Sequence, residues 1–171
     1  MTIQEKIDAL KKEFVDKIAE LEKQLVEEQN PKQSKAWKPI EGEKYFFIDA
    51  DGDVSDYTWE GFDDEEIYAM GNCFKTKEEA EWEKEHRIVT TELKHFVAEN
   101  DPRPITEEDW EDNSNKYYIV HKYDNNRVGI CSVFSNRVAR QVYASNMEVL
   151  EKAIEHIGEE RLKKYYFGVG K

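Results

Sequence analysis

The strongest candidates for a chemical role are the carboxylates of the run Asp49-Ala50-Asp51-Gly52-Asp53, which have the alternate spacing of a calcium-binding loop. Positions one, three, five and twelve of an EF-hand loop would be Asp49, Asp51, Asp53 and Glu60. Position six, where that loop needs Gly for its sharp turn, is Val54, and both flanks have the composition of strands. The pair Asp51-Gly52 is a strong hairpin signal. We therefore predict a hairpin turn here and no metal site.

Other chemistry-bearing residues are scattered. The four histidines, which show no zinc-ligand spacing, are His86, His95, His121 and His156. No GxSxG, phosphate-loop or dinucleotide glycine pattern is present. Carboxylates are so abundant that no pair of them indicates a general acid and base. We predict that the protein is not an enzyme and uses no cofactor.

The net charge of −13 is unevenly distributed. Residues 41–85 hold 16 acidic and 4 basic side chains, residues 99–112 hold 7 and 1, and residues 113–171 hold 6 and 10. A nucleic-acid backbone binds clustered Lys and Arg, so direct contact with nucleic acid is not expected. The acidic part is either a solvated face that keeps the protein in solution or a surface for a protein partner with a basic surface. In the second case the predicted contact residues are Asp49, Asp51, Asp53, Asp56, Asp63, Asp64, Glu65 and Glu66.

The second half of the chain repeats the first. An aromatic run follows a Trp in both halves, and a pattern of six residues recurs 69 positions later: Phe74, Thr76, Glu79, Ile88, Leu93 and Lys94 become Tyr143, Ser145, Glu148, Ile157, Leu162 and Lys163. Both Thr76 with Glu79 and Ser145 with Glu148 have the spacing of a helix capping box. We predict an α+β fold: a long N-terminal helix followed by two duplicated antiparallel β-sheet units, each closed by a helix.

The first repeat is expected to cover residues 37–98 and the second residues 116–171, with a polar connector at 99–115. In the first, strands are predicted at 44–48, 54–59 and 67–74 before the helix, with a loop at 61–66. In the second, strands are predicted at 116–123, 128–134 and 138–143. Gly158 should end the second helix before a short final turn.

Residues 1–30 have the pattern of one amphipathic helix, and 31–36 form a linker. The apolar stripe, which repeats every eleven residues, contains Ile3, Ile7, Leu10, Phe14, Ile18, Leu21 and Leu25. Such a stripe must be buried, either along its own domain or against a second copy. For a homodimer the predicted contact residues are Ile7, Leu10, Phe14, Ile18, Leu21 and Leu25.

Several features indicate the cytoplasm. No run approaches the roughly 18 apolar residues needed to span a membrane, and the N-terminus has no secretory pattern. Cys73 and Cys131 form no CxxC pair, which is typical of free thiols in a reducing compartment.

Two stretches carry a resemblance. Trp37-Lys38-Pro39-Ile40-Glu41-Gly42-Glu43-Lys44-Tyr45 and Gly71-Asn72-Cys73-Phe74-Lys75-Thr76-Lys77-Glu78-Glu79-Ala80 resemble the W-x-P-x-x-G-E-x-Y and G-N-x-F-x-T-K-E-E-A motifs of a family of uncharacterised small phage and prophage proteins of Firmicutes. The resemblance implies a phage origin and localisation in the cytoplasm of an infected bacterial host, and it assigns no catalytic residues.

Two functions follow as hypotheses. The first is a non-catalytic, anti-CRISPR-like inhibitor of a bacterial defence system, which binds a basic nucleic-acid-handling partner such as a defence nuclease complex through its acidic first repeat. The second is a dimeric phage structural or assembly adaptor without inhibitory activity.

Overall fold

The computed structural model describes residues 17–18, 37–139 and 141–170. The chain divides into two compact units, Met1–Lys38 and Pro39–Lys171. In the first unit, Lys17 and Ile18 have helical backbone. The rest of the predicted helix over 1–30, the linker over 31–36 and the dimer residues Ile7, Leu10, Phe14, Leu21 and Leu25 lie outside the described residues, so the N-terminal part of the predicted fold stays a prediction.

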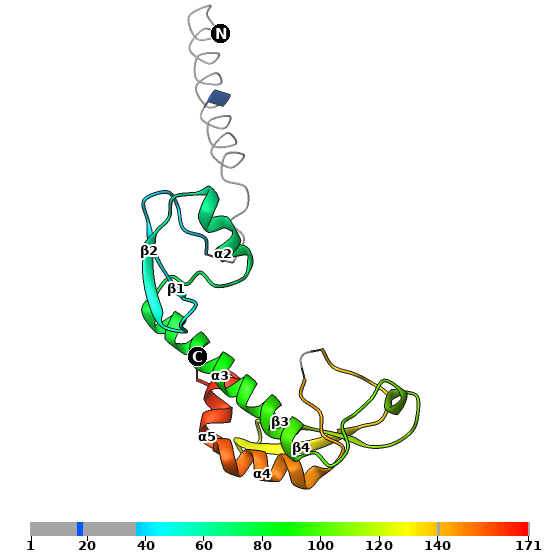
Figure 1. Cartoon of the computed structure of the whole chain (residues 1–171). Helices are drawn as coiled ribbons and strands as arrows, with labels where there is room; N and C mark the ends of the chain where they lie inside the picture. Colours follow the sequence, from blue (N-terminus) through cyan, green and yellow to red (C-terminus); the bar gives the residue numbers. More distant parts are fainter. Residues whose placement is uncertain (1–16, 19–36, 140, 171) are drawn as a thin grey trace, which may run out of the picture. The chain divides into compact units, whose positions relative to one another are not determined.

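The second unit is an α+β arrangement of two two-stranded antiparallel sheets around a long helix (Figure 1). Its elements are, in chain order, β1 (Lys44–Ile48), β2 (Val54–Thr58), η1 (Phe62–Asp64), α2 (Glu65–Ala69), α3 (Lys77–Asn100), η2 (Glu108–Trp110), β3 (Lys116–Lys122), β4 (Arg127–Val133), α4 (Met147–Ile157), α5 (Glu159–Arg161) and η3 (Leu162–Tyr166). The α+β class and the two hairpins are therefore confirmed.

In the first repeat, β1 and β2 pair from Lys44 opposite Thr58 to Ile48 opposite Val54, joined by the expected turn. The predicted third strand over 67–74 is wrong. Its first half belongs to α2, and only Phe74 pairs with β1, through an isolated bridge to Phe46. Acidic residues at the start of α2 favour a helix there, and Gly71, with φ of +68°, turns the chain back toward β1.

The second repeat has the same plan. Strands β3 and β4 pair from Lys116 opposite Val133 to Lys122 opposite Arg127. The predicted strand over 138–143 is also wrong, since only Ala144 returns to the hairpin, in an isolated bridge to Tyr117.

A side-chain amide supplements the single bridge in each repeat. Asn72 donates to the Ile48 carbonyl at 2.8 Å and accepts from the Ile48 amide at 3.3 Å. Gln141 donates to the Ile119 carbonyl at 3.1 Å. These amides bond backbone groups that a third strand would otherwise pair, so one bridge suffices at each hairpin edge.

The helix caps correct the register of the repeat. Thr76 Oγ1 accepts from the Glu79 amide at 3.2 Å, and Glu79 Oε2 accepts from the Thr76 amide at 3.3 Å, so the first capping box is confirmed. The second is wrong: Asn146 caps α4 by accepting from the Glu148 amide at 2.9 Å. The amide and hydroxyl of Ser145 donate instead to Asp101. Caps at 76 and 146, like bridges at 74 and 144, are 70 positions apart, one more than the sequence offset.

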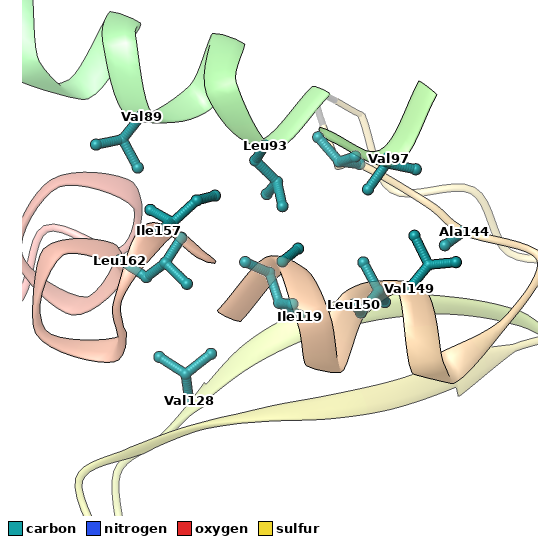
Figure 2. Close-up of a cluster of buried hydrophobic side chains, with 12 residues drawn as sticks. Val89, Leu93, Val97, Ile119, Val128, Ala144, Val149, Leu150, Ile157 and Leu162 are labelled. Carbon is teal, nitrogen blue, oxygen red and sulfur yellow. The ribbon is translucent and has the colours of Figure 1, made fainter. Parts of the chain in front are cut away.

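The main hydrophobic core belongs to the second repeat, but the helix of the first repeat completes it (Figure 2). Val89, Leu93 and Val97 of α3 pack among side chains of the second hairpin, the segment over 142–144, α4 and η3. These side chains are Ile119, Val128, Val142, Ala144, Val149, Leu150, Ala153, Ile157 and Leu162. Gly158 ends α4 as expected, with φ of +93°. The two repeats therefore share α3 and fold as one body.

Candidate protein-binding surface

Asp64, one of the eight predicted contact acids, is buried and holds the first repeat together. Its Oδ1 accepts from the Tyr45 hydroxyl at 2.9 Å, and its Oδ2 accepts from the Glu60 amide at 2.6 Å. Burial first, and then this carboxylate, raise the pKa of Tyr45 above its ordinary value of 10.0, because an ionised phenolate would lack water beside a negative charge. Asp64, only 3% exposed, is therefore not available to a partner.

Asp49 has a similar internal role in the hairpin turn. Its Oδ1 accepts from the amides of Asp51 and Asp53, and its Oδ2 accepts from the Ser55 hydroxyl at 2.9 Å. These hydrogen bonds, the one from the Asp53 amide first, lower the pKa of the Asp49 carboxyl below its ordinary value. The carboxylate thus closes the turn itself, which confirms the hairpin interpretation of this run.

Two further acids are paired with lysines at the surface. Asp53 contacts Lys84 of α3 at 3.2 Å, and Asp56 contacts Lys44 across the hairpin at 2.8 Å. Both carboxylates remain well exposed. Exposed ion pairs of this kind contribute about 0–1 kcal/mol, so a partner's Lys or Arg can compete for them at little cost.

The other predicted contact acids occupy the turn and α2. Asp51, Glu65 and Glu66 are exposed. Asp63 lies in η1, and its side chain is outside the described part of the structure. Among the eight predicted contact acids, five are therefore both described and exposed: Asp51, Asp53, Asp56, Glu65 and Glu66.

The segment over 62–70 is one continuous helical turn and helix whose outer face mixes apolar and acidic side chains. Asp64, Ile67 and Tyr68 are buried or half-buried, at helical spacing. The outer face carries Phe62, Glu65, Glu66, Ala69 and Met70. Phe62 is 91% exposed and Met70 is 72% exposed. No other large apolar side chain in the described ranges is as exposed as Phe62.

Contacts at both ends hold this segment on the hairpin. At its start, Asp64 binds Tyr45, and Tyr45 packs edge-on against Trp59 at 5.9 Å. In its middle, the Tyr68 ring packs edge-on against the Trp59 ring, with 6.4 Å between the ring centroids. At its end, the Asn72 amide donates to the Ile67 carbonyl at 3.0 Å, while the Asn72 side chain bonds Ile48. The outer face is therefore presented in a fixed conformation.

Sequence reasoning missed Phe62 and Met70 because it assigned 61–66 to a loop and 67–74 to a strand. The available signal was the spacing of Phe62, Glu66, Ala69 and Met70, which is i, i+4, i+7 and i+8 on a helix. The acids at 63–66 also have the position of a helix N-terminus.

Histidines and cysteines are used in packing or lie apart. His86 stacks on Trp82 at 5.4 Å and its Nδ1 contacts the Tyr165 carbonyl at 2.6 Å. Burial, the largest cause, raises the pKa of the Cys73 thiol to about 11, which leaves little reactive thiolate at neutral pH. Within the described ranges, no three His, Cys, Asp or Glu side chains are grouped to hold a metal ion.

Two concavities along α3 are lined by none of the five exposed acids. A groove of about 680 Å³ contains His156, which lies 3.5 Å from Glu92. A pocket of about 310 Å³ is lined by Trp110, whose ring meets Tyr143 edge-on at 5.0 Å and Arg137 at 5.6 Å. The contacts of His156 and Trp110 hold elements of the fold together.

Comparison of this chain with protein-family models, with curated proteins and with solved structures yields no match. Within the part of the chain that the structure describes, no helix combines the length and apolar character needed to cross a membrane. What the protein binds must therefore be argued from its own surface.

Proposed function

We propose that this chain is a non-catalytic binding protein that inhibits a bacterial defence system by occupying the basic, nucleic-acid-handling surface of a partner such as a defence nuclease complex. The observation that carries the proposal is the exposure of five carboxylates on the first repeat: Asp51, Asp53, Asp56, Glu65 and Glu66. The phage-like motifs around Trp37 and Gly71 supply the biological setting.

The charge distribution supports a protein partner with the opposite sign. Residues 41–85 carry 16 acidic and 4 basic side chains. A surface with this excess attracts Lys and Arg and repels phosphate, so it competes with nucleic acid for the same channel. Two of the five carboxylates are paired with lysines, the exposed Lys44 and the half-buried Lys84, in surface ion pairs that a partner's cations can displace.

Two of the eight predicted acids, Asp49 and Asp64, accept hydrogen bonds inside the first repeat, whereas five others are exposed. Replacing all eight predicted acids would also remove the Asp64 and Asp49 hydrogen bonds, and loss of binding could then result from unfolding. The informative variant therefore changes only the five exposed acids to Asn or Gln, and leaves Asp49, Asp63 and Asp64 in place.

The experiment is to express tagged full-length protein in a Firmicutes host with active defence systems and identify what co-purifies after nuclease treatment. We expect a nucleic-acid-processing complex that is released at high salt, since the Debye length falls from about 8 Å at 0.15 M salt to about 3 Å at 1 M. The five-acid variant should lose this complex.

A matched control removes the same charge elsewhere. The five exposed acids to be changed to Gln are Glu108, Glu111, Glu148, Glu151 and Glu155. Because both variants have the same net charge, only the position of the carboxylates differs. Retention of the complex by the first variant, or equal loss by both variants, would contradict binding through the first repeat.

A further inference from the structure

The exposed apolar side chains of the segment over 62–70 call for an explanation of their own. Single exposed apolar residues are common on protein surfaces. Phe62 and Met70 differ because they flank two exposed acids, Glu65 and Glu66, on the outer face of one helical segment. They are eight positions apart, which is about 12 Å along the axis of a helix.

The segment is also fixed before any partner arrives. Its inner face is tied to the hairpin through the hydrogen bond between Asp64 and Tyr45, at 2.9 Å, and through the packing of Tyr68 on Trp59. A contact surface that is already ordered loses little conformational entropy on binding. Apolar anchors spaced along one face of a helix are the way in which amphipathic helices bind apolar grooves.

We infer that the helical segment over 62–70 is the docking element of this protein, with Phe62 and Met70 entering an apolar groove on a partner protein and Glu65 and Glu66 pairing with Lys or Arg on the rim of that groove. This inference rests on the proposed function and names the partner more closely. Charge alone would fit any basic surface, whereas this arrangement requires an apolar groove with a basic border.

The charges of this face decide the nature of the partner. Glu65 and Glu66 lie between the two apolar anchors, so the partner must present cations close to its groove. Two copies paired through this face would repel each other, because residues 41–85 carry 16 acidic and 4 basic side chains. The partner is therefore a different protein with apolar and basic side chains in one place.

A defined probe tests this without the natural partner. The full-length protein is used at physiological salt to select from a library of small repeat proteins whose concave face is randomised, and selected binders are labelled for fluorescence anisotropy. We expect selected binders to combine Lys or Arg with aromatic or aliphatic residues on that face. Phe62→Ser and Met70→Ser should each weaken their binding at least about tenfold.

The matched control is Tyr123→Ser, which removes an aromatic side chain that is 83% exposed on the second hairpin. It should change the affinity less than twofold. Denaturant unfolding of each variant checks the fold, which Phe62→Ser should leave intact because that side chain is almost fully exposed. No enriched binders, or binders that bind Phe62→Ser as well as the unchanged protein, would overturn the inference.

The capture experiment in the host then separates the two proposals. Loss of the complex with the five-acid variant but not with Phe62→Ser would overturn the docking element and leave the proposed function standing. Loss with Phe62→Ser but not with the five-acid variant would overturn binding through surface charge, the Glu65 and Glu66 contacts included, and would leave only the apolar anchors of the docking element standing. Retention by both variants would overturn both.

Discussion

Removal of the Tyr45 hydroxyl should destabilise the first repeat, because this hydroxyl is the link between the hairpin and the helical segment that follows it. The change is Tyr45→Phe, which keeps the ring. The ring of Tyr45 is fully buried against Trp59, at 5.9 Å, so its packing should survive. Only the hydrogen bond to Asp64 is lost.

The size of the effect follows from the environment of that bond. Both partners are buried, the O···O distance is 2.9 Å, and the acceptor is a carboxylate. Hydrogen bonds to charged groups contribute about 1.5–3 kcal/mol. Asp64 keeps its second hydrogen bond, from the Glu60 amide, so the carboxylate is not left without a donor. We therefore expect a loss of about 2 kcal/mol in the free energy of unfolding.

The assay is a double-mutant cycle by urea unfolding with Tyr45→Phe, Asp64→Ala and the double variant. A coupling energy of about 2 kcal/mol is expected, since the two residues are in direct contact. Tyr123→Phe, at an exposed position, should change stability by less than about 0.5 kcal/mol. A coupling energy below about 0.5 kcal/mol would refute the assignment of this bond as the link.

The same bond predicts the response to alkali. The pKa of Tyr45 in the folded protein is raised above the ordinary value of 10.0, first by burial and then by Asp64. The proton is therefore held more tightly in the folded state, and stability is lost as the pH rises above the value for the unfolded chain. The unchanged protein should lose more stability above pH 10.0 than Tyr45→Phe does.

Three other predictions are independent of this link. Hydrogen bonds, the one from the Thr106 amide first, lower the pKa of Asp109 from 3.8 to about 2. The contribution of this carboxylate to the free energy of unfolding is therefore present above pH 3.8 and is lost as the pH falls toward about 2. In an acid titration monitored by fluorescence, Asp109→Asn should be less sensitive to pH in this range than the unchanged protein. Lys116 is 1% exposed and its Nζ donates to two carbonyls at 2.9 and 2.8 Å, so Lys116→Met should lower the free energy of unfolding by about 2 kcal/mol in urea. If the N-terminal stripe forms a dimer, Phe14→Asp with Leu21→Asp should give monomers in light scattering; a monomeric unchanged protein would contradict the dimer.

Local signals predicted the parts of the fold that depend on neighbours in sequence. The Asp51-Gly52 turn, the Thr76 capping box and the end of α4 at Gly158 are each determined within a few residues, and all three are confirmed. The third strand of each repeat is wrong because pairing there depends on distant groups. Asn72 and Gln141 bond the hairpin through side chains, which strand propensity does not register.

The candidate surface was predictable in composition but not in detail. Counting charge identified the acidic first repeat, yet it could not tell Asp64, which is buried, from Glu65 and Glu66, which are exposed. That distinction requires knowing which face of the segment packs on the hairpin. Because the segment was expected as loop and strand, Phe62 was not recognised as the most exposed large apolar residue of the described chain.

The duplication shows how one buried position can be filled by different chemistry. Tyr45 and Lys116 each precede the bridge residue of their hairpin, Phe46 and Tyr117, and each is almost completely buried. Tyr45 ends in a hydroxyl bonded to the Asp64 carboxylate, whereas the Lys116 ammonium donates to two backbone carbonyls and lies 3.4 Å from the Asp112 carboxylate. A buried polar tip is costly unless it is bonded, so each repeat had to supply its own acceptors. The first repeat supplies a side chain from the segment over 62–70, and this choice ties the hairpin to the helical face that carries Phe62. The second repeat supplies the carbonyls of Ser114 and Phe134 together with Asp112, and its hairpin is covered by α4. The buried polar tip is therefore bonded by the helical segment in the first repeat and by residues that flank the hairpin in the second.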